Sequence, residues 1–167
     1  MTATVFDLTG YVRAWNEGDL DGIVDYYAED ARVTRSSVLV AWEGHEGIRQ
    51  GIGNYLDAWS GLHVVPRNLL QDGNRVAVVL SYSGTHARAM ELAPGERLMP
   101  SGRRVAHDIA HFLTLDSEGK ILRDEGILDM LSFLGQLGAS GEQLETAALR
   151  ETQQMAPAPE APLGGSP

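Results

Sequence analysis

Two histidines four residues apart are the side chains in this sequence best suited to proton transfer. His107 and His111 lie in the run Arg103–Leu115, which reads as a β-strand. One face of that strand would carry Val105, His107, Ile109, His111 and Leu113. An imidazole on such an apolar face can act as a general acid or base near neutral pH. The alternative is a core histidine that only packs and satisfies its hydrogen bonds internally.

Three carboxylates in the following segment are candidate partners for a histidine. Asp124 and Glu125 lie in the predicted strand Lys120–Leu128, and Asp129 comes directly after it. An apolar pocket raises the pKa of a carboxylic acid, which suits acid/base catalysis. Simpler roles are also open, because Asp124 and Glu125 could be solvated edge charges. Asp129 could be the N-cap of a short helix over residues 131–137.

The elements that must position these groups fall into two parts. Apolar spacing in the first 60 residues predicts helices over 6–16, 21–27 and 44–59, with extended chain over 32–42. Gly18 ends the first helix, and Asp19 is the expected N-cap of the second. From residue 62 onward the pattern changes to strands over 62–70, 75–85, 103–115 and 120–128. Helices followed by hairpin-linked strands indicate an α+β fold in which a curved antiparallel sheet wraps around the helices.

Two further segments are defined by their composition. The loop over 86–102 contains Pro94, Gly95 and Pro100, and its length is typical of either a lid over a site or a surface excursion. We predict one domain over 1–138 and a C-terminal extension over 139–167. Residues 141–154 of that extension could form a polar helix. The segment after it, rich in proline and glycine, is expected to be disordered.

Composition and charge exclude several classes of function. The 167 residues include no cysteine, which excludes disulfides, thiolate metal sites and a cysteine nucleophile. A net charge of −10 disfavours binding to nucleic acid and to anionic membrane surfaces. No segment reads as a signal peptide or a membrane span, so we expect a soluble, cytoplasmic protein.

Motifs for nucleotides and metals are also missing from the sequence. There is no GxxxxGK[ST] loop, no GxGxxG after a strand and no GxSxG elbow. His107 and His111 are poor ligands for one ion, because four residues of a strand span about 13 Å. We therefore expect no metal and no nucleotide cofactor.

Several short segments together resemble the SnoaL-like polyketide cyclases. They are Ala14-Trp15-Asn16-Glu17-Gly18-Asp19, Ser83-Gly84-Thr85-His86, Pro100-Ser101-Gly102-Arg103-Arg104-Val105, Gly119-Lys120-Ile121, Asp129 and Gln136-Leu137-Gly138. The resemblance implies a ketosteroid-isomerase-like α+β barrel with a cone-shaped pocket, no cofactor and a homodimer. The outer face of the sheet could supply the dimer interface.

The resemblance also implies roles for individual residues. His111 falls where these cyclases carry an active-site histidine. The family's catalytic aspartate, however, falls on Gly126, which cannot move a proton. Asp124 lies two residues back on the same strand face, and Glu125 and Asp129 flank the vacancy, so these three are the candidate replacements. Trp15 matches an aromatic position that lines the family's cavity. The candidate substrate contacts are Trp15, Tyr26, Trp59, Tyr82 and His107.

These observations support one leading function and two alternatives. The leading hypothesis is a cofactor-independent enzyme of natural-product biosynthesis that closes a ring in a polyketide-like small molecule by aldol-type acid/base chemistry. A second enzymatic hypothesis uses the same pocket for isomerisation, epoxide opening or hydroxylation, because one fold hosts many chemistries. The third is a dimer that binds a small molecule without catalysis.

Overall fold

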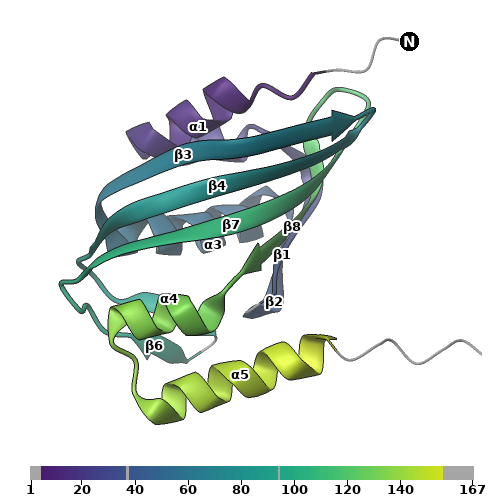
Figure 1. Ribbon diagram of the computed structural model, residues 1–167. Coiled ribbons are helices and arrows are strands. Elements are labelled where there is room, and N and C mark those ends of the chain that lie inside the picture. The colour runs from purple at the N-terminus through teal and green to yellow at the C-terminus, as the bar shows by residue number, and fades with distance from the viewer. Residues whose placement is uncertain (1–4, 37, 94, 156–167) are drawn as a thin grey trace, which may run out of the picture.

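The N-terminal third of the chain forms three helices and two strands (Figure 1). The computed structural model describes residues 5–36, 38–93 and 95–155. Helix α1 (Leu8–Glu17) ends at Gly18, whose φ of 65° gives the left-handed turn that glycine adopts without strain. Helix α2 (Leu20–Val24) is capped by Asp19 as predicted, but it ends before residue 27 because strand β1 begins there. Strands β1 (Tyr27–Arg35) and β2 (Val38–Glu43) precede helix α3 (Gly44–Ala58).

A curved six-stranded sheet follows and confirms the predicted α+β fold. Its other strands are β3 (Trp59–Asp72), β4 (Arg75–His86), β7 (Arg104–Leu115) and β8 (Ile121–Leu128). The strand order is β2-β1-β8-β7-β4-β3. Neighbouring strands are antiparallel except β1 and β8, which are parallel. Figure 1 shows α3 lying behind the long strands and α1 running beside β3 at the edge of the sheet, so the sheet curves around these helices.

The inner face of the sheet builds the core by simple alternation. In β4, Val76, Val78, Leu80 and Tyr82 are buried at every second position. In β7 the inner face carries the five residues expected from the sequence, including both histidines. On the opposite face, which could supply the dimer interface, Phe112 is 50% exposed and Ile127 is 55% exposed.

One end of the fold is closed by elements that the sequence did not fully predict. The loop over 86–102 contains a hairpin of β5 (Met90–Ala93) and β6 (Glu96–Leu98). Helix α4 (Met130–Leu137) forms a second apolar cluster with this hairpin, in which Met90, Leu98 and Phe133 are buried. Helix α5 (Gly141–Met155) confirms the predicted polar helix. Residues 156–167, where the disordered tail was expected, lie outside the described residues.

The cap of α4 decides between the two roles that the sequence left open for Asp129. Its side chain accepts a hydrogen bond from the backbone N–H of Ser132 at 2.9 Å, and it is exposed at the start of the helix. Asp129 is therefore an N-cap in this fold, and it stabilises the helix whose buried face closes the core.

We expect Asp129→Ala to lower the free energy of unfolding by about 1 kcal/mol, because the N–H of Ser132 loses its acceptor. Asp129→Ser is the matched control, since a serine oxygen can accept the same bond and should retain most of the stability. Urea unfolding followed by circular dichroism would measure both. Equal losses in the two variants would contradict the capping role.

Candidate functional site

A buried ionic network at the centre of the sheet contains the predicted histidine. His111 and Gly126 are cross-strand partners in β7 and β8, which places Asp124 diagonally beside the imidazole on the same face. The Nδ1 of His111 lies 2.9 Å from Oδ1 of Asp124. Neither residue is more than 2% exposed. Of the three candidate carboxylates, Asp124 is thus the one that the fold brings to the histidine.

Asp124 is held as a carboxylate by the groups around it. Arg35 donates from Nη1 and Nη2 to its two oxygens at 3.1 and 3.0 Å, and the Tyr27 hydroxyl donates to Oδ2 at 2.9 Å. Burial alone would favour the protonated acid, but the adjacent Arg35 guanidinium and His111 outweigh it and hold the pKa of the Asp124 carboxyl well below its usual range. Asp124 therefore orients and stabilises His111, and it is a poor proton donor itself.

The network reaches a cavity through Tyr82. The Tyr82 hydroxyl lies 3.3 Å from Nε2 of His111, and the Tyr82 side chain lines the cavity, whereas His111 and Asp124 do not. Asp124 accepts a hydrogen bond from the proton on Nδ1 of His111. In the neutral imidazole Nε2 then carries no proton, and it can accept a hydrogen bond from the Tyr82 hydroxyl. Burial, with Tyr11 and Tyr55 nearby, raises the pKa of Tyr82 well above its usual value, so the phenol stays protonated. The arrangement Tyr82–His111–Asp124 can pass a proton between the core and the cavity.

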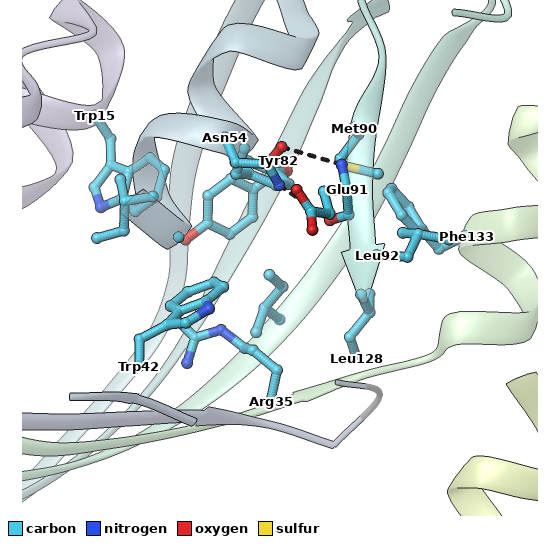
Figure 2. A pocket seen from close by; sticks show the side chains of 14 residues that line it. Trp15, Arg35, Trp42, Asn54, Tyr82, Met90, Glu91, Leu92, Leu128 and Phe133 are labelled. Carbon is cyan, nitrogen blue, oxygen red and sulfur yellow. Dashed lines mark hydrogen bonds between the residues drawn. The ribbon is translucent and has the colours of Figure 1, made fainter. Parts of the chain in front are cut away.

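The cavity itself is small and largely aromatic (Figure 2). Its volume is about 90 Å³, several times the roughly 10–15 Å³ that a single water molecule needs. Its walls include Trp15, Trp42, Tyr55, Tyr82, Leu92, Ile109, Leu128 and Phe133. Figure 2 shows Asn54 and Glu91 joined by hydrogen bonds at one side of the cavity, with Arg35 and Trp42 at another. An apolar lining of this kind strengthens the few polar interactions that it contains.

The position of the missing family aspartate is occupied by a cation. A Cβ on Gly126 would lie 2.7 Å from Cδ and 2.9 Å from Nε of Arg35, so the Arg35 side chain runs through the space that a side chain at position 126 would need. Arg35 lies beside Gly126 in the parallel β1–β8 pairing, and it lines the cavity. The glycine therefore makes room for the guanidinium that binds Asp124.

His107 packs behind two cavity-lining tyrosines, Tyr55 and Tyr82, and is not part of the ionic network. Its Nε2 lies 3.0 Å from the Tyr55 hydroxyl, and its ring stacks on Tyr82 with centroids 5.6 Å apart. Its Nδ1 is buried without a hydrogen-bond partner among the described residues. Burial lowers the pKa of His107 to about 4, so the ring is neutral at neutral pH.

The other predicted site residues lie in different places. Trp15 lines the cavity, as its family position implied, whereas Trp59 is buried behind it against Phe133. Tyr26 is not one of the residues that line the cavity, and its hydroxyl donates to Asp7 near the start of α1. Glu125 is exposed on the outer face of the sheet, because neighbouring strand residues point to opposite sides.

We therefore do not carry three of these residues into the candidate site. Glu125 and Tyr26 point elsewhere, and Asp129 caps α4. Asp108, which neighbours His107 in sequence, is likewise exposed and accepts a hydrogen bond from Ser81. Glu125 was a candidate because it flanks Gly126, but its side of strand β8 keeps it from the cavity.

The cavity residues that were missed in the sequence include Arg35, Tyr55 and Glu91. Arg35 follows the alternation Ala31, Val33, Arg35 of inward positions in β1, which is the signal that could have placed it inside. Tyr55 lies on the apolar side of α3 and was treated only as part of a helical pattern. Glu91 lies in the unpredicted strand β5, where the Asn54 side chain bonds its backbone N–H and C=O at 3.0 Å each.

The pKa of His107 gives the fold a testable pH dependence. Because the folded pKa is about 4 against 6.5 for the free side chain, the unfolded chain binds the proton more readily between these values. The free energy of unfolding should therefore decrease as the pH falls from 6.5 towards 4, by about 3 kcal/mol at most from this group. His107→Phe should lose less stability over that interval. Urea unfolding at about pH 7 and about pH 4.5 would measure the two losses.

Other groups do not obscure the His107 comparison. Burial also lowers the pKa of His86, but His86 is present in both proteins and cancels in the difference. The depressed pKa of Asp124 stabilises the fold at pH values above the unfolded pKa of about 3.9, and this contribution is lost only below that pH. If wild type and His107→Phe lost equal stability between the two pH values, the assignment of a depressed pKa to His107 would be wrong.

Comparison with known proteins identifies the family of the chain. The model of the SnoaL-like domain matches residues 8–124. No curated protein matches the chain. Among the described residues no helix is long and apolar enough to cross a membrane.

Solved structures share this fold. A candidate SnoaL-like polyketide cyclase from Jannaschia sp. CCS1 is 22% identical with a TM-score of 0.65, covering 80% of this chain and 92% of that one. The epoxide hydrolase/cyclase-like enzyme SalBIII acts in pyran ring formation in the polyether salinomycin. It is 28% identical with a TM-score of 0.59, and the match covers 75% of this chain and 89% of that one. A third structure is a protein with a ketosteroid-isomerase-like fold from Catenulispora acidiphila in complex with trimethylamine. It is 18% identical with a TM-score of 0.65, and the match covers 83% of this chain and 98% of that one. The matched family model spans most of the core built by α1, α3 and the curved sheet, and the chain belongs to the SnoaL-like family.

Proposed function

We propose that this protein is a cofactor-independent enzyme that closes a ring in a polyketide-like intermediate by aldol-type acid/base chemistry. The observation that carries the proposal is the Tyr82–His111–Asp124 arrangement, which ends at an aromatic cavity. Family membership supports the general class of chemistry, because relatives with this fold include polyketide cyclases. A cavity of about 90 Å³ would enclose about one ring of such a substrate, and the rest would extend past the mouth.

The proposed reaction assigns one proton transfer to each side of the cavity. Glu91 is the carboxylate among the lining residues, and as the base it would remove a proton from the carbon next to a substrate carbonyl. The resulting carbanion attacks a second carbonyl carbon in the same molecule, which forms the C–C bond and leaves an alkoxide. Tyr82 donates its proton to that alkoxide, and protonated His111 restores the Tyr82 proton from Nε2.

Asp124 acts in this scheme as a positioning residue. Its carboxylate accepts from Nδ1 of His111 in both protonation states of the imidazole, so the ring keeps one orientation through the cycle. Glu91 is exposed and returns its proton to water. A proton from water in the cavity then reaches His111 through the Tyr82 hydroxyl, and the enzyme is restored without a cofactor.

We expect Tyr82→Phe to lower kcat by about a hundredfold or more with little change in KM, because the proton donor is lost while the ring surface remains. A suitable assay follows an aryl δ-diketone, whose aldol closure gives a six-membered ring, together with deuterium uptake at its α-carbons in heavy water. His111→Gln should likewise lower kcat with little change in KM. Glu125→Gln is the matched control, since that side chain neighbours Asp124 but lies on the outer face.

The same experiment separates the alternatives. Unchanged turnover in folded Tyr82→Phe and His111→Gln variants would exclude the assigned relay. Binding of the diketone without turnover or deuterium uptake in the wild type would favour a binding protein. An epoxide-opening function has a specific observation in its favour, because SalBIII is an epoxide hydrolase/cyclase-like enzyme. Turnover of an aryl epoxy alcohol in place of the diketone would support that second candidate.

We also propose that two chains pair through the outer face of the sheet. Three apolar side chains are exposed on this face: Leu70 at 73%, Phe112 at 50% and Ile127 at 55%. Leu70 and Phe112 lie in one cross-strand row, because Ala77 of β4 pairs with Leu70 of β3 on one side and with Phe112 of β7 on the other. Such a face is costly to leave in water, and a twofold pairing buries it against its own copy.

Phe112→Asp should convert the dimer to a monomer, because it would bury a carboxylate in an apolar interface. Light scattering coupled to size-exclusion chromatography measures the molar mass directly. Glu118→Gln, in the turn after β7, is the control and should leave the mass unchanged. A wild-type protein that is monomeric at every concentration tested would contradict the dimer.

A further inference from the structure

One edge of the Arg35 guanidinium has no partner in the part of the chain that the structure describes. Nη1 donates to the Thr34 carbonyl at 2.9 Å and to Asp124 at 3.1 Å, and Nη2 donates once to Asp124 at 3.0 Å. A guanidinium has five N–H groups, so three are used. The Nε–H and the second Nη2–H remain. These two point from the same edge of the planar group, in the parallel geometry that a carboxylate accepts.

This free edge belongs to a side chain that is held in place at the cavity wall. Asp124 fixes the adjacent Nη1/Nη2 edge with two hydrogen bonds, and the guanidinium carbon lies 5.7 Å from the centroid of the Trp42 ring. The Arg35 side chain is 11% exposed and lines the cavity. Figure 2 shows Arg35 and Trp42 side by side at one side of the cavity. A group fixed in this way loses little freedom when it binds a ligand.

The cavity offers this edge few acceptors of its own. Arg35 is the only cation among the lining residues, and the one carboxylate among them, Glu91, makes no hydrogen bond to Arg35. The tyrosines in the wall, Tyr55 and Tyr82, keep their protons because burial raises the pKa of each phenol. The two hydroxyls are already paired with the imidazoles of His107 and His111. Arg35 thus offers an unpaired donor edge in a largely apolar wall, which favours a ligand that carries acceptor oxygens.

We propose that Arg35 is a specificity-determining residue whose free Nε and Nη2 edge binds a carboxylate group of the substrate. The inference rests on the proposed function, since it names the substrate class of the same cavity: an aromatic or polyketide-like carboxylic acid. Gly126 is part of this subsite, because only a residue without a side chain leaves Arg35 its position.

Benzoate and benzamide are a matched pair of probes for the subsite, because they differ in charge and in one donor group but not in ring size. In NMR titrations of the wild-type protein at neutral pH, benzoate should bind at least about tenfold more tightly than benzamide. Gly126→Ala should abolish that preference, since its Cβ would lie 2.7 Å from Cδ of Arg35 and would displace the guanidinium. This variant leaves both charges of the Arg35–Asp124 pair in the protein, whereas Arg35→Met would leave Asp124 buried without its cation.

Gly135→Ala is the matched control for Gly126→Ala, because a Cβ at that position of α4 meets no atom within 4 Å. It should keep the preference for benzoate. Equal affinities for the two probes in the wild type, no binding of either probe, or an unchanged preference in Gly126→Ala would each overturn the proposal. Turnover of the aryl δ-diketone, which has no carboxylate, does not depend on this subsite. If that turnover required Tyr82 while benzoate showed no preference, the proposed function would stand and only the carboxylate subsite would fail.

Discussion

The ion pair between Arg35 and Asp124 is the interaction on which the interior of this fold depends. Asp124 is completely buried, and a buried carboxylate is tolerated only when charge and hydrogen bonds compensate for the water it has lost. Arg35 supplies the charge from β1, while His111 and Tyr27 supply further bonds from β7 and β1. The pair therefore joins three neighbouring strands and spans the one parallel pairing in the sheet. A slip of β1 by one residue would turn Arg35 outward and leave Asp124 uncompensated.

The same pair sets the chemistry that the cavity can perform. An ionised Asp124 fixes the Nδ1 side of His111, and this leaves Nε2 for Tyr82. In the proposed reaction, the proton donor at the cavity wall is therefore a phenol with an imidazole behind it, while Glu91 serves as the base. The aromatic packing of Trp15, Tyr55 and His107 around Tyr82 limits the movement of that phenol. Stability and reactivity therefore rest on the same few buried contacts.

The sequence was most informative where structure is local. Alternation along β7 correctly placed His111 on the inner face, and the same rule put Asp124 on the face of position 126. It could not choose between Asp124 and Glu125, because that choice depends on which face of β8 meets the core. Arg35 escaped notice because its partner lies 89 residues away, and the parallel β1–β8 pairing that joins them leaves no local pattern. Glu91 was missed because strand β5 has only four residues and lies in a segment rich in loop-forming residues.

Gly126 shows how one position can change a site without removing its architecture. The resemblance to SnoaL-like cyclases places an aspartate there, and a glycine at that point first suggests a loss of function. In this fold the glycine is a requirement, because any Cβ would collide with the Arg35 side chain. The wall thus has a guanidinium beside position 126, in a lining that is otherwise largely aromatic and apolar. This arrangement supports the proposed carboxylate subsite, since a ligand that leaves the free edge of Arg35 unmatched adds a desolvation cost to binding.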